Sequence, residues 1–439
     1  MLKKHSINFK NPLLLNLVIV GFVTLAVKLL GLIKESFVGS TFGLSEFLDT
    51  YALAILIPAF IQNVFVGAIK NIFIPNYIIE KKSTKQYGSF QSLTCILILG
   101  INCFFGLLIL FFNSYLLEVL FPNHDSEFYS LISKQLTVLL PCLFFWGLNG
   151  FFSALLEIEN KFFFTSITPI YISICTLIAV FFFKDFFEDY VLAVGMLIGS
   201  FFSFVHLLLG ALYFKLIILK KIELNNNMKI MMSQIPAKTI SGLLTGINPI
   251  VDQFFAAQLV AGSVIAISYG EKIPAFGISI VMIALGNVLL PHFSELVTND
   301  IKKAYLELFK ILKIAFITSL LFAGVMIFFS EDIIRILFQR NSFNMEDTQI
   351  VSTIQQLLLI HVPFFIITRI LVKFLTSINK NNFMALISLV SVITNLIMNY
   401  LLIDTLKVYG LALSTSIVLT LNSFIFLWYT LKQFKKTHA

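Results

Sequence analysis

Residues 89–113 read SFQSLTCILILGINCFFGLLILFFN, a run without Asp, Glu, Lys or Arg. The hydrocarbon core of a bilayer is about 30 Å thick, and an α-helix needs about 20 apolar residues to cross it. This run is long enough for such a helix and too apolar for the surface of a soluble domain. It therefore predicts a transmembrane helix.

Similar runs, separated by short polar breaks, follow one another along the 439-residue chain. The chain is 58% hydrophobic and only 12% charged, whereas charged residues make up about 25% of a typical soluble domain. The runs predict an all-α polytopic membrane protein with about twelve transmembrane helices. The expected helices cover residues 13–33, 48–78, 89–113, 129–157, 162–183, 190–218, 235–259, 263–290, 309–329, 348–375, 383–403 and 408–431.

The polar breaks alternate between basic ones and ones with more acidic residues. Cytoplasmic loops of membrane proteins are enriched in Lys and Arg, so the basic breaks are assigned to the cytoplasm, together with both termini. The start of the chain resembles a signal peptide but lacks a small-residue cleavage site, so we expect the first membrane helix there. The basic breaks contain Lys3, Lys4, Lys10, Lys81, Lys82, Lys85, Lys161, Lys220, Lys221, Lys229, Lys302, Lys303, Lys380, Lys432, Lys435 and Lys436.

One proline pattern occurs twice. The segment Ile57-Pro58-Ala59-Phe60 corresponds to Ile273-Pro274-Ala275-Phe276, 216 residues later. The spacing predicts that six helices have been duplicated, and six is even, so both copies enter the membrane in the same sense. The other corresponding positions, at or near the same offset, are Asn71 with Asn287, Pro75 with Pro291, Glu35 with Asp252, and Asn160-Lys161 with Asn379-Lys380.

The duplication predicts two parallel six-helix lobes with a transport path between them. We expect the lobes at 1–218 and 235–439, joined by a cytoplasmic linker at 219–234. Proline removes a backbone hydrogen bond inside a helix and favours a kink. Pro58 and Pro274 are therefore the expected hinges of a movement of one lobe against the other.

Charged side chains inside the apolar runs indicate function, because a charge in the membrane interior is costly unless it faces a cavity or a partner. Several cations at one cavity favour an anion with many oxygens, such as a pyrophosphate. In the alternative interpretation, neighbouring Lys and Glu residues form neutral structural pairs, and Lys373 reaches the membrane surface. Neighbours on a helix point about 100° apart, however, so we expect partners on other helices. The charged residues are Lys28, Lys34, Glu35, Asp49, Asp252, Glu271, Lys272, Arg369 and Lys373.

Some uncharged or weakly basic residues also lie in the apolar runs. Asn395 and Asn399 are four residues apart and share a helix face. Interhelical hydrogen bonding is the default interpretation of Asn in a membrane helix. The alternative is that the two amides form a cation site with Asp252, because hard cations prefer oxygen ligands. His206 and His361 are interpreted as hydrogen-bonded core residues, with a proton relay as the alternative.

The sequence contains no GxSxG, P-loop or HExxH motif, so we expect a transporter without a cofactor rather than an enzyme. Transport would then draw on an Na⁺ or H⁺ gradient, the membrane potential or the gradient of the substrate. The net charge of +8 is spread over the breaks, which argues against nucleic acid as a partner. The four cysteines show no CxxC spacing, so neither a disulfide framework nor a metal site is indicated.

Two segments resemble the MurJ/MviN lipid II flippases of the MOP exporter superfamily. The first extends from Lys28 to Glu35 and continues through Phe42-Gly43, Asp49, Ile57-Pro58 and Phe73-Ile74-Pro75, and the second contains Ala261-Gly262-Ser263-Val264, Tyr269-Gly270-Glu271-Lys272, Pro274 and 285–291. The resemblance covers essentially the whole chain. It implies a V-shaped pair of lobes in the bacterial inner membrane, which export an undecaprenyl-pyrophosphate-linked saccharide by alternating access.

The resemblance also implies roles for individual residues. Lys28, Lys34 and Lys272 match cavity cations that bind the pyrophosphate, and Arg369 corresponds to a Lys of the family. Asp49 matches an acidic residue at the start of the second helix, and Glu35 and Glu271 are the other candidate acidic or gating residues. The expected partners are the lipid-linked saccharide, membrane lipids and glycan-synthesis enzymes.

Two departures from the family pattern keep alternatives open. Gln62-Asn63 stands where the family has a pair of Arg, and the chain ends after the twelfth expected helix, where family members add two helices that form a groove for the lipid tail. One alternative is a flippase for O-antigen, capsule or other surface-polysaccharide units. A cation-coupled drug exporter is disfavoured by the cavity cations, and a scaffold for glycan-synthesis enzymes is disfavoured by the short cytoplasmic breaks.

Overall fold

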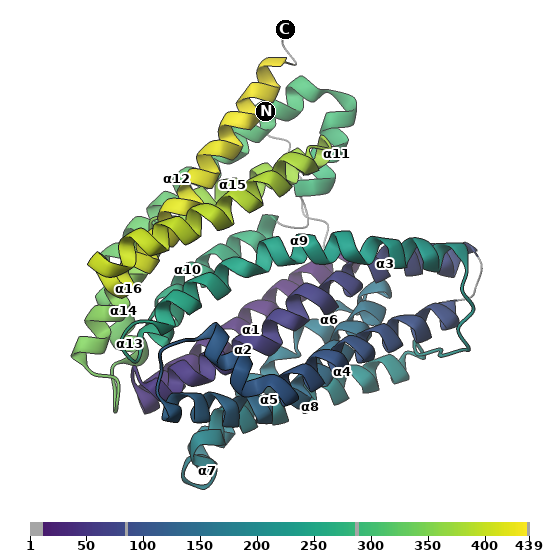
Figure 1. Ribbon diagram of the computed structural model, residues 1–439. Coiled ribbons are helices and arrows are strands. Elements are labelled where there is room, and N and C mark those ends of the chain that lie inside the picture. Colours follow the sequence, from purple (N-terminus) through teal and green to yellow (C-terminus); the bar gives the residue numbers. More distant parts are fainter. Residues whose placement is uncertain (1–11, 84–86, 286–288, 437–439) are drawn as a thin grey trace. The chain divides into compact units, whose positions relative to one another are not determined.

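The computed structural model describes residues 12–83, 87–285 and 289–436 (Figure 1), and no β-strand occurs in these ranges. Lys3, Lys4, Lys10, Lys85 and Asn287 lie outside the described residues. In chain order the helices are α1 (Pro12–Phe42), α2 (Glu46–Ile61), the π-helix η1 (Gln62–Val66), α3 (Gly67–Ser83), α4 (Tyr87–Leu120), α5 (Ser126–Ile158), α6 (Phe162–Ser166), α7 (Pro169–Phe187), the 3-10 helix η2 (Glu188–Tyr190), α8 (Val191–Tyr213), α9 (Asn226–Ala257), α10 (Ser263–Leu285), α11 (Leu289–Asn299), α12 (Ile301–Phe328), α13 (Ser330–Phe338), α14 (Met345–Leu359), α15 (Val362–Ser377) and α16 (Asn381–Lys436).

Every expected membrane span begins within one of these helices, but α16 contains two of them. A straight helix of its 56 residues would be about 84 Å long, nearly three bilayer cores. The backbone leaves the helical conformation at Lys407, where φ is 51°, and this residue separates the expected spans 383–403 and 408–431. Seven described segments are long and apolar enough to cross a membrane, or eight if α14 and α15, bent by 40°, form one span.

Large apolar side chains cover much of the surface of these helices. Phe111, Phe186, Phe328 and Tyr400 are each more than 70% exposed. Soluble monomers rarely expose apolar patches of such extent, whereas lipid solvates them without cost. The expected fold class, an all-α polytopic membrane protein, is confirmed.

The two Asn-Lys turns that the repeat pairs with each other have the same local structure. Asn160 has a φ of 58° and Asn379 a φ of 57°. In both turns the following Lys donates its backbone N–H to the carbonyl five residues earlier, over 2.8 Å at Lys161 and 2.9 Å at Lys380. This is the Schellman ending of a helix, with Asn in the left-handed position. The correspondence read from the sequence is therefore also a correspondence of backbone structure.

The chain divides into two compact units. The first consists of Met1–Lys34, Ala54–Leu116 and Ser130–Gly242, and the second of Glu35–Leu53, Leu117–Tyr129 and Leu243–Ala439. The boundaries between the units cut through α1, α2, α4, α5 and α9. Residues 226–234, assigned above to the linker, are helical and begin α9. The lobe boundaries inferred from the repeat stay a prediction.

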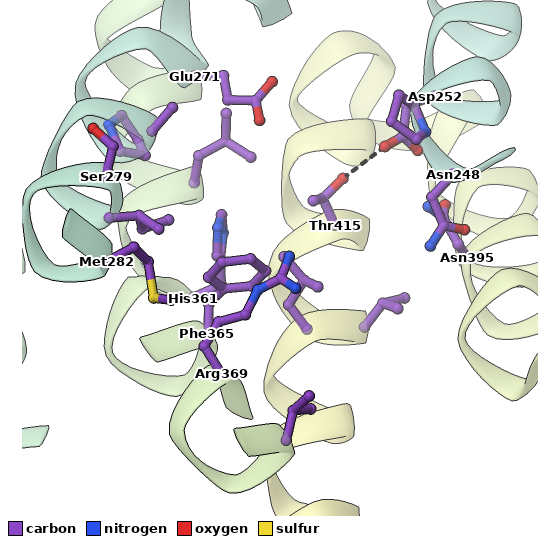
Figure 2. A pocket seen from close by; sticks show the side chains of 18 of the residues that line it. Asn248, Asp252, Glu271, Ser279, Met282, His361, Phe365, Arg369, Asn395 and Thr415 are labelled. Carbon is purple, nitrogen blue, oxygen red and sulfur yellow. Dashed lines mark hydrogen bonds between the residues drawn. The ribbon is translucent and has the colours of Figure 1, made fainter. Parts of the chain in front are cut away.

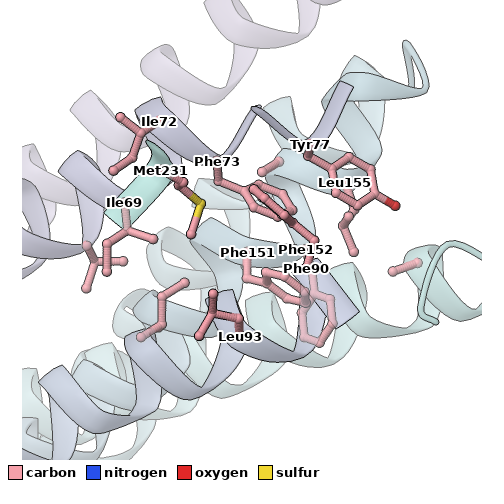
Figure 3. Close-up of a cluster of buried hydrophobic side chains, with 14 of the residues drawn as sticks. Ile69, Ile72, Phe73, Tyr77, Phe90, Leu93, Phe151, Phe152, Leu155 and Met231 are labelled. Atoms are coloured by element: carbon pink, nitrogen blue, oxygen red, sulfur yellow. The ribbon is translucent and has the colours of Figure 1, made fainter. Parts of the chain in front are cut away.

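An aromatic cluster forms the core of the first unit (Figure 3). The ring of Phe73 on α3 lies 5.9 Å from that of Phe90 on α4 and 5.7 Å from that of Phe151 on α5. Met231 of α9 is fully buried in the same cluster. The cluster thereby joins four helices and holds the start of α3, directly after η1, in place.

The linker is fastened to the first unit by buried polar side chains. Glu80 of α3 is fully buried, and its carboxylate accepts hydrogen bonds from the side-chain amides of Asn225 over 2.7 Å and Asn227 over 2.9 Å. On α4, Gln91 accepts the backbone N–H of Ile218 over 2.8 Å. These bonds fix the chain between α8 and α9, and they satisfy a buried carboxylate that would otherwise be costly.

Candidate functional site

Lys272 of α10 forms an ion pair with a residue of another helix. Its Nζ lies 3.5 Å from Oε1 of Glu35 on α1, and the two side chains are 33% and 22% exposed. The expectation that charged neighbours on a helix find partners on other helices is confirmed for this residue. A phosphate that binds Lys272 must therefore share the ammonium group with Glu35 or displace the carboxylate.

Lys28 and Lys34 lie in the part of α1 that belongs to the first unit. Lys28 is exposed and Lys34 is half-buried. Their spacing of six residues directs the two side chains about 120° apart around the helix, since successive residues turn by about 100°. The two ammonium groups are thus presented from different sides of α1, and their role in pyrophosphate binding stays a prediction.

Asp49 caps a helix. It is 4% exposed, and its two carboxylate oxygens accept the backbone N–H of Gly262 over 2.7 Å and of Ile265 over 2.8 Å at the start of α10. An anion at a helix N-terminus satisfies unpaired N–H groups and interacts favourably with the helix dipole. Gly262 has a φ of 90°, and a Cβ there would lie 2.8 Å from the carbonyl oxygen of Leu44. Position 262 therefore requires glycine. The gating role of Asp49 stays a prediction.

A pocket of about 750 Å³ lies within the second unit (Figure 2). Its lining comes mainly from α9, α10, α15 and α16 and includes the candidate residues Asp252, Glu271, Pro274, Arg369 and Asn395. Figure 2 shows the Arg369 side chain extending into the space that Glu271 and Thr415 border. Lys373 also lines this pocket. The structure thus brings candidate residues of α9 and α10 together with candidate residues of α15 and α16.

Arg369 packs against an aromatic ring in this pocket. Its guanidinium carbon lies 4.5 Å from the centre of the Phe365 ring, a cation–π contact. Within the part of the chain that the structure describes, Arg369 forms no ion pair with a carboxylate. A guanidinium group offers several donors in a fixed plane, so Arg369 is suited to bind an anion with several oxygens.

Asp252 lies in a cluster of oxygen-bearing side chains beside the pocket. Its Oδ1 accepts the amide N–H of Asn399 over 2.8 Å, and its Oδ2 accepts the hydroxyl of Thr415 over 3.3 Å. Asn399 also donates to Oδ1 of Asn395 over 2.7 Å, which confirms that the two amides share a face. The Oδ1 atom of Asn399 is buried without a hydrogen-bond partner. These bonds join α9 to α16, so the interhelical hydrogen bonding expected by default is present. Carboxylate and neutral oxygens are also the ligands that hard cations prefer, and the cation site stays a prediction.

Both histidines in apolar runs are hydrogen-bonded, and His361 is a buried core residue as expected, whereas His206 is half-buried. His206 contacts the Tyr171 hydroxyl over 3.0 Å and the Phe164 carbonyl over 3.2 Å. His361 is 5% exposed, and its Nδ1 lies 3.3 Å from the Ser416 hydroxyl. His361 also lines the pocket of the second unit, which its sequence neighbourhood did not indicate.

Lys70 is an intramembrane cation that the sequence analysis missed. It lies on α3, and its Nζ is 2.9 Å from Oε1 of Glu157 on α5. The signal was present, since Lys70 stands inside the expected span 48–78. Its partner 87 residues later lies near the end of the span 129–157 and could not be read from the sequence.

Known proteins resemble the chain over nearly its whole length. The sequence model of the family described as "Lipid II flippase MurJ" matches residues 38–439. A probable lipid II flippase MurJ of Buchnera aphidicola subsp. Schizaphis graminum is 28% identical over 427 residues, which are 95% of this chain and 83% of the relative. The probable lipid II flippase MurJ of Rickettsia prowazekii is 27% identical over 441 residues, 95% of this chain and 84% of the relative.

Solved structures of transporters share the fold. A lipid II flippase MurJ in an inward closed conformation superposes with a TM-score of 0.82 at 24% identity, covering 95% of this chain and 89% of that one. An inward-facing multidrug resistance transporter of the MATE family, in the MOP superfamily, gives a TM-score of 0.78 at 15% identity, covering 95% of this chain and all of that one. At such identities the likeness concerns the arrangement of the helices.

Proposed function

Because the chain belongs to the lipid II flippase MurJ family, we propose that it flips lipid II, an undecaprenyl-pyrophosphate-linked saccharide, from the cytoplasmic to the outer leaflet of the bacterial inner membrane. The match of the family model over residues 38–439 carries this proposal, and both relatives described above bear the same description. These descriptions favour lipid II over the polysaccharide-unit and drug-export alternatives. The chain is a multi-pass membrane transporter, and its substrate serves peptidoglycan synthesis.

The cations of the membrane helices support a pyrophosphate-linked substrate. We propose that Lys28, Lys34, Lys272 and Arg369 contact the pyrophosphate during transport. Ammonium groups attract phosphate as point charges, and a guanidinium group can bind two phosphate oxygens at once. Membrane lipids are the surrounding solvent, and glycan-synthesis enzymes are proposed partners.

A cation gradient is the proposed energy source. The oxygen cluster around Asp252 would hold Na⁺, and an H⁺ gradient or the membrane potential is the alternative. Pro58 and Pro274 interrupt the hydrogen bonding of α2 and α10, and we propose that they are bending points of alternating access. Glu35, Asp49 and Glu271 remain the proposed acidic or gating residues of the path.

The function can be tested in proteoliposomes with a fluorescent polyprenyl-pyrophosphate disaccharide. We expect the purified protein to expose the labelled headgroup to a membrane-impermeant quencher much faster than in protein-free vesicles. A polyprenyl monophosphate without sugar serves as the control substrate and should be flipped poorly. Efflux of a cationic dye without any movement of the saccharide lipid would instead assign the chain to drug export.

The proposed topology places both termini in the cytoplasm, because basic residues concentrate in the alternate breaks. A C-terminal fusion to alkaline phosphatase, which is active only outside the cytoplasm, should be inactive. A fusion at residue 124, in the polar break after α4, should be active. The reverse pattern would overturn the orientation.

A further inference from the structure

The first unit contains a pocket of its own beside the π-helix η1. The pocket measures about 290 Å³, and its lining includes Gln62, Asn63, Lys70, Trp146 and Gly150. A π-helical turn carries one residue more than an α-helical turn and often occurs at functional sites. Here the turn buries the side chains of Val64 and Val66 and leaves the side chain of Asn63 exposed. It thereby presents an amide group at the π-helical turn of a continuous membrane helix.

The pocket is electrically neutral although a lysine lines it. The Lys70 ammonium lies 2.9 Å from the Glu157 carboxylate and 3.4 Å from the Ser153 hydroxyl. The Glu157 carboxylate offsets the attraction of this ammonium group for a phosphate and would itself repel the phosphate. The pocket therefore suits a polar but uncharged ligand, unlike the Arg369 pocket of the second unit.

The aromatic wall of the pocket is held in a fixed orientation. The indole N–H of Trp146 on α5 donates to the Ser200 hydroxyl on α8 over 2.8 Å. That hydroxyl in turn donates to the carbonyl of Met196 over 2.7 Å. An indole whose N–H is already bonded offers the pocket an apolar face. Gly150 follows one turn later on the same helix and leaves the space beside the indole open.

Amide groups supply the polar wall. Gln62 donates its amide nitrogen to Asn102 Oδ1 over 2.9 Å and to the Leu143 carbonyl over 2.7 Å, which leaves its own oxygen as an acceptor. The exposed amide of Asn63 provides both donors and an acceptor. An apolar plane with neighbouring amides matches a sugar ring, which has one face of C–H groups and a rim of hydroxyl or acetamido groups.

We propose that this pocket binds one sugar ring of the transported lipid-linked saccharide. Trp146 would lie against the C–H face of the ring, and Asn63 and Gln62 would hydrogen-bond to its hydroxyl or acetamido groups. The volume lies just below the range of about 300–1,000 Å³ for ligand pockets, so it admits one ring rather than a whole glycan. The identity of the ligand as part of the substrate rests on the proposed function.

Intrinsic fluorescence can test the site directly, because the chain contains only two tryptophans. The other one, Trp428 on α16, is 59% exposed, so Trp428→Phe leaves Trp146 as the sole reporter in a folded protein. Titration of this variant with free N-acetylglucosamine should give a saturable change in emission, half-complete at millimolar concentration, as expected for a single small ring. Inorganic phosphate should give no change.

Two further variants in the Trp428→Phe background separate binding from folding. Asn63→Ala removes a hydrogen-bonding group and should raise the half-saturating concentration by about tenfold. Gly150→Ala places a methyl group 3.7 Å from Val66 Cγ1, an ordinary contact, so the protein should fold with a narrower pocket and weaker binding. The control is Gly100→Ala, because nothing lies within 4 Å of its added Cβ. This variant should bind the sugar like its parent.

The outcomes distinguish this site from the function as a whole. If the Trp428→Phe protein flips the saccharide lipid but Trp146 does not respond to the sugar, the site is overturned and the flippase function stands. A response to the dipeptide D-Ala-D-Ala instead of the sugar would also overturn it. If the sugar binds with the expected variant pattern but no lipid is flipped, the sugar site is supported and the proposed function fails.

Discussion

Lys272→Gln should lose most of the flipping activity, whereas Lys272→Arg should keep much of it. A charge-assisted hydrogen bond to a desolvated phosphate contributes about 1.5–3 kcal/mol, so neutral replacement should weaken productive binding by about ten- to a hundredfold. We expect the same ranking of Lys34→Gln and Lys34→Arg. The measurement is flipping of the fluorescent saccharide lipid in proteoliposomes, normalised to the amount of inserted protein.

The ion pair of Lys272 with Glu35 offers a control for a purely structural role. Removing Lys272 alone leaves a partly buried carboxylate without this partner, which can lower the amount of inserted protein. The double variant Glu35→Gln/Lys272→Gln removes both charges and should restore insertion but not flipping. Recovery of flipping in the double variant would contradict the phosphate-binding role. Full flipping activity of both Lys34→Gln and Lys272→Gln would contradict it as well.

Asp252→Asn should abolish the response of the protein to Na⁺. Asp252 supplies the carboxylate of its cluster, and carboxylate oxygens contribute most to holding a hard cation. Without this carboxylate, Na⁺ binding should weaken by at least about a hundredfold. A ligand that binds only the folded protein at 100 times its Kd stabilises it by about 2.7 kcal/mol, which a melting curve detects. Na⁺ should therefore raise the melting temperature of the wild type but not of Asp252→Asn.

Thr415→Val is the matched variant of the same site. It removes the hydroxyl that donates to Asp252 and keeps the shape of the side chain, so it should weaken the Na⁺ response without abolishing it. K⁺ and choline at equal ionic strength control for screening. An Na⁺ response in Asp252→Asn equal to that of the wild type would exclude the cluster, and a response to pH alone would favour coupling to protons.

The helices could be predicted from the sequence because lipid imposes a long apolar run on every span. The shared face of Asn395 and Asn399 could also be predicted, since it depends only on the helical period. The partner of Asp49 could not, because it is the backbone at the start of a helix more than 200 residues later. A backbone N–H carries no signature in the sequence.

The pocket beside η1 escaped prediction for a different reason. In the sequence, Gln62 and Asn63 stand out only as a departure from the family pattern. The directions of their side chains depend on a π-helical turn, which the apolar periodicity does not indicate. The sequence places Lys70 in an apolar run, but its ion pair with Glu157 depends on the packing of α3 against α5. Local patterns identified the residues of the second unit better, since there the charges stood out from apolar neighbours.

The buried Glu80 carboxylate and its two asparagines restrict the chain between α8 and α9. The root-mean-square end-to-end distance of a flexible linker grows with the square root of its length. Here the bonds to Glu80 and Gln91 remove that freedom before the helix α9 begins. The stretch between α8 and α9 is therefore held as part of the folded first unit and does not behave as a flexible tether.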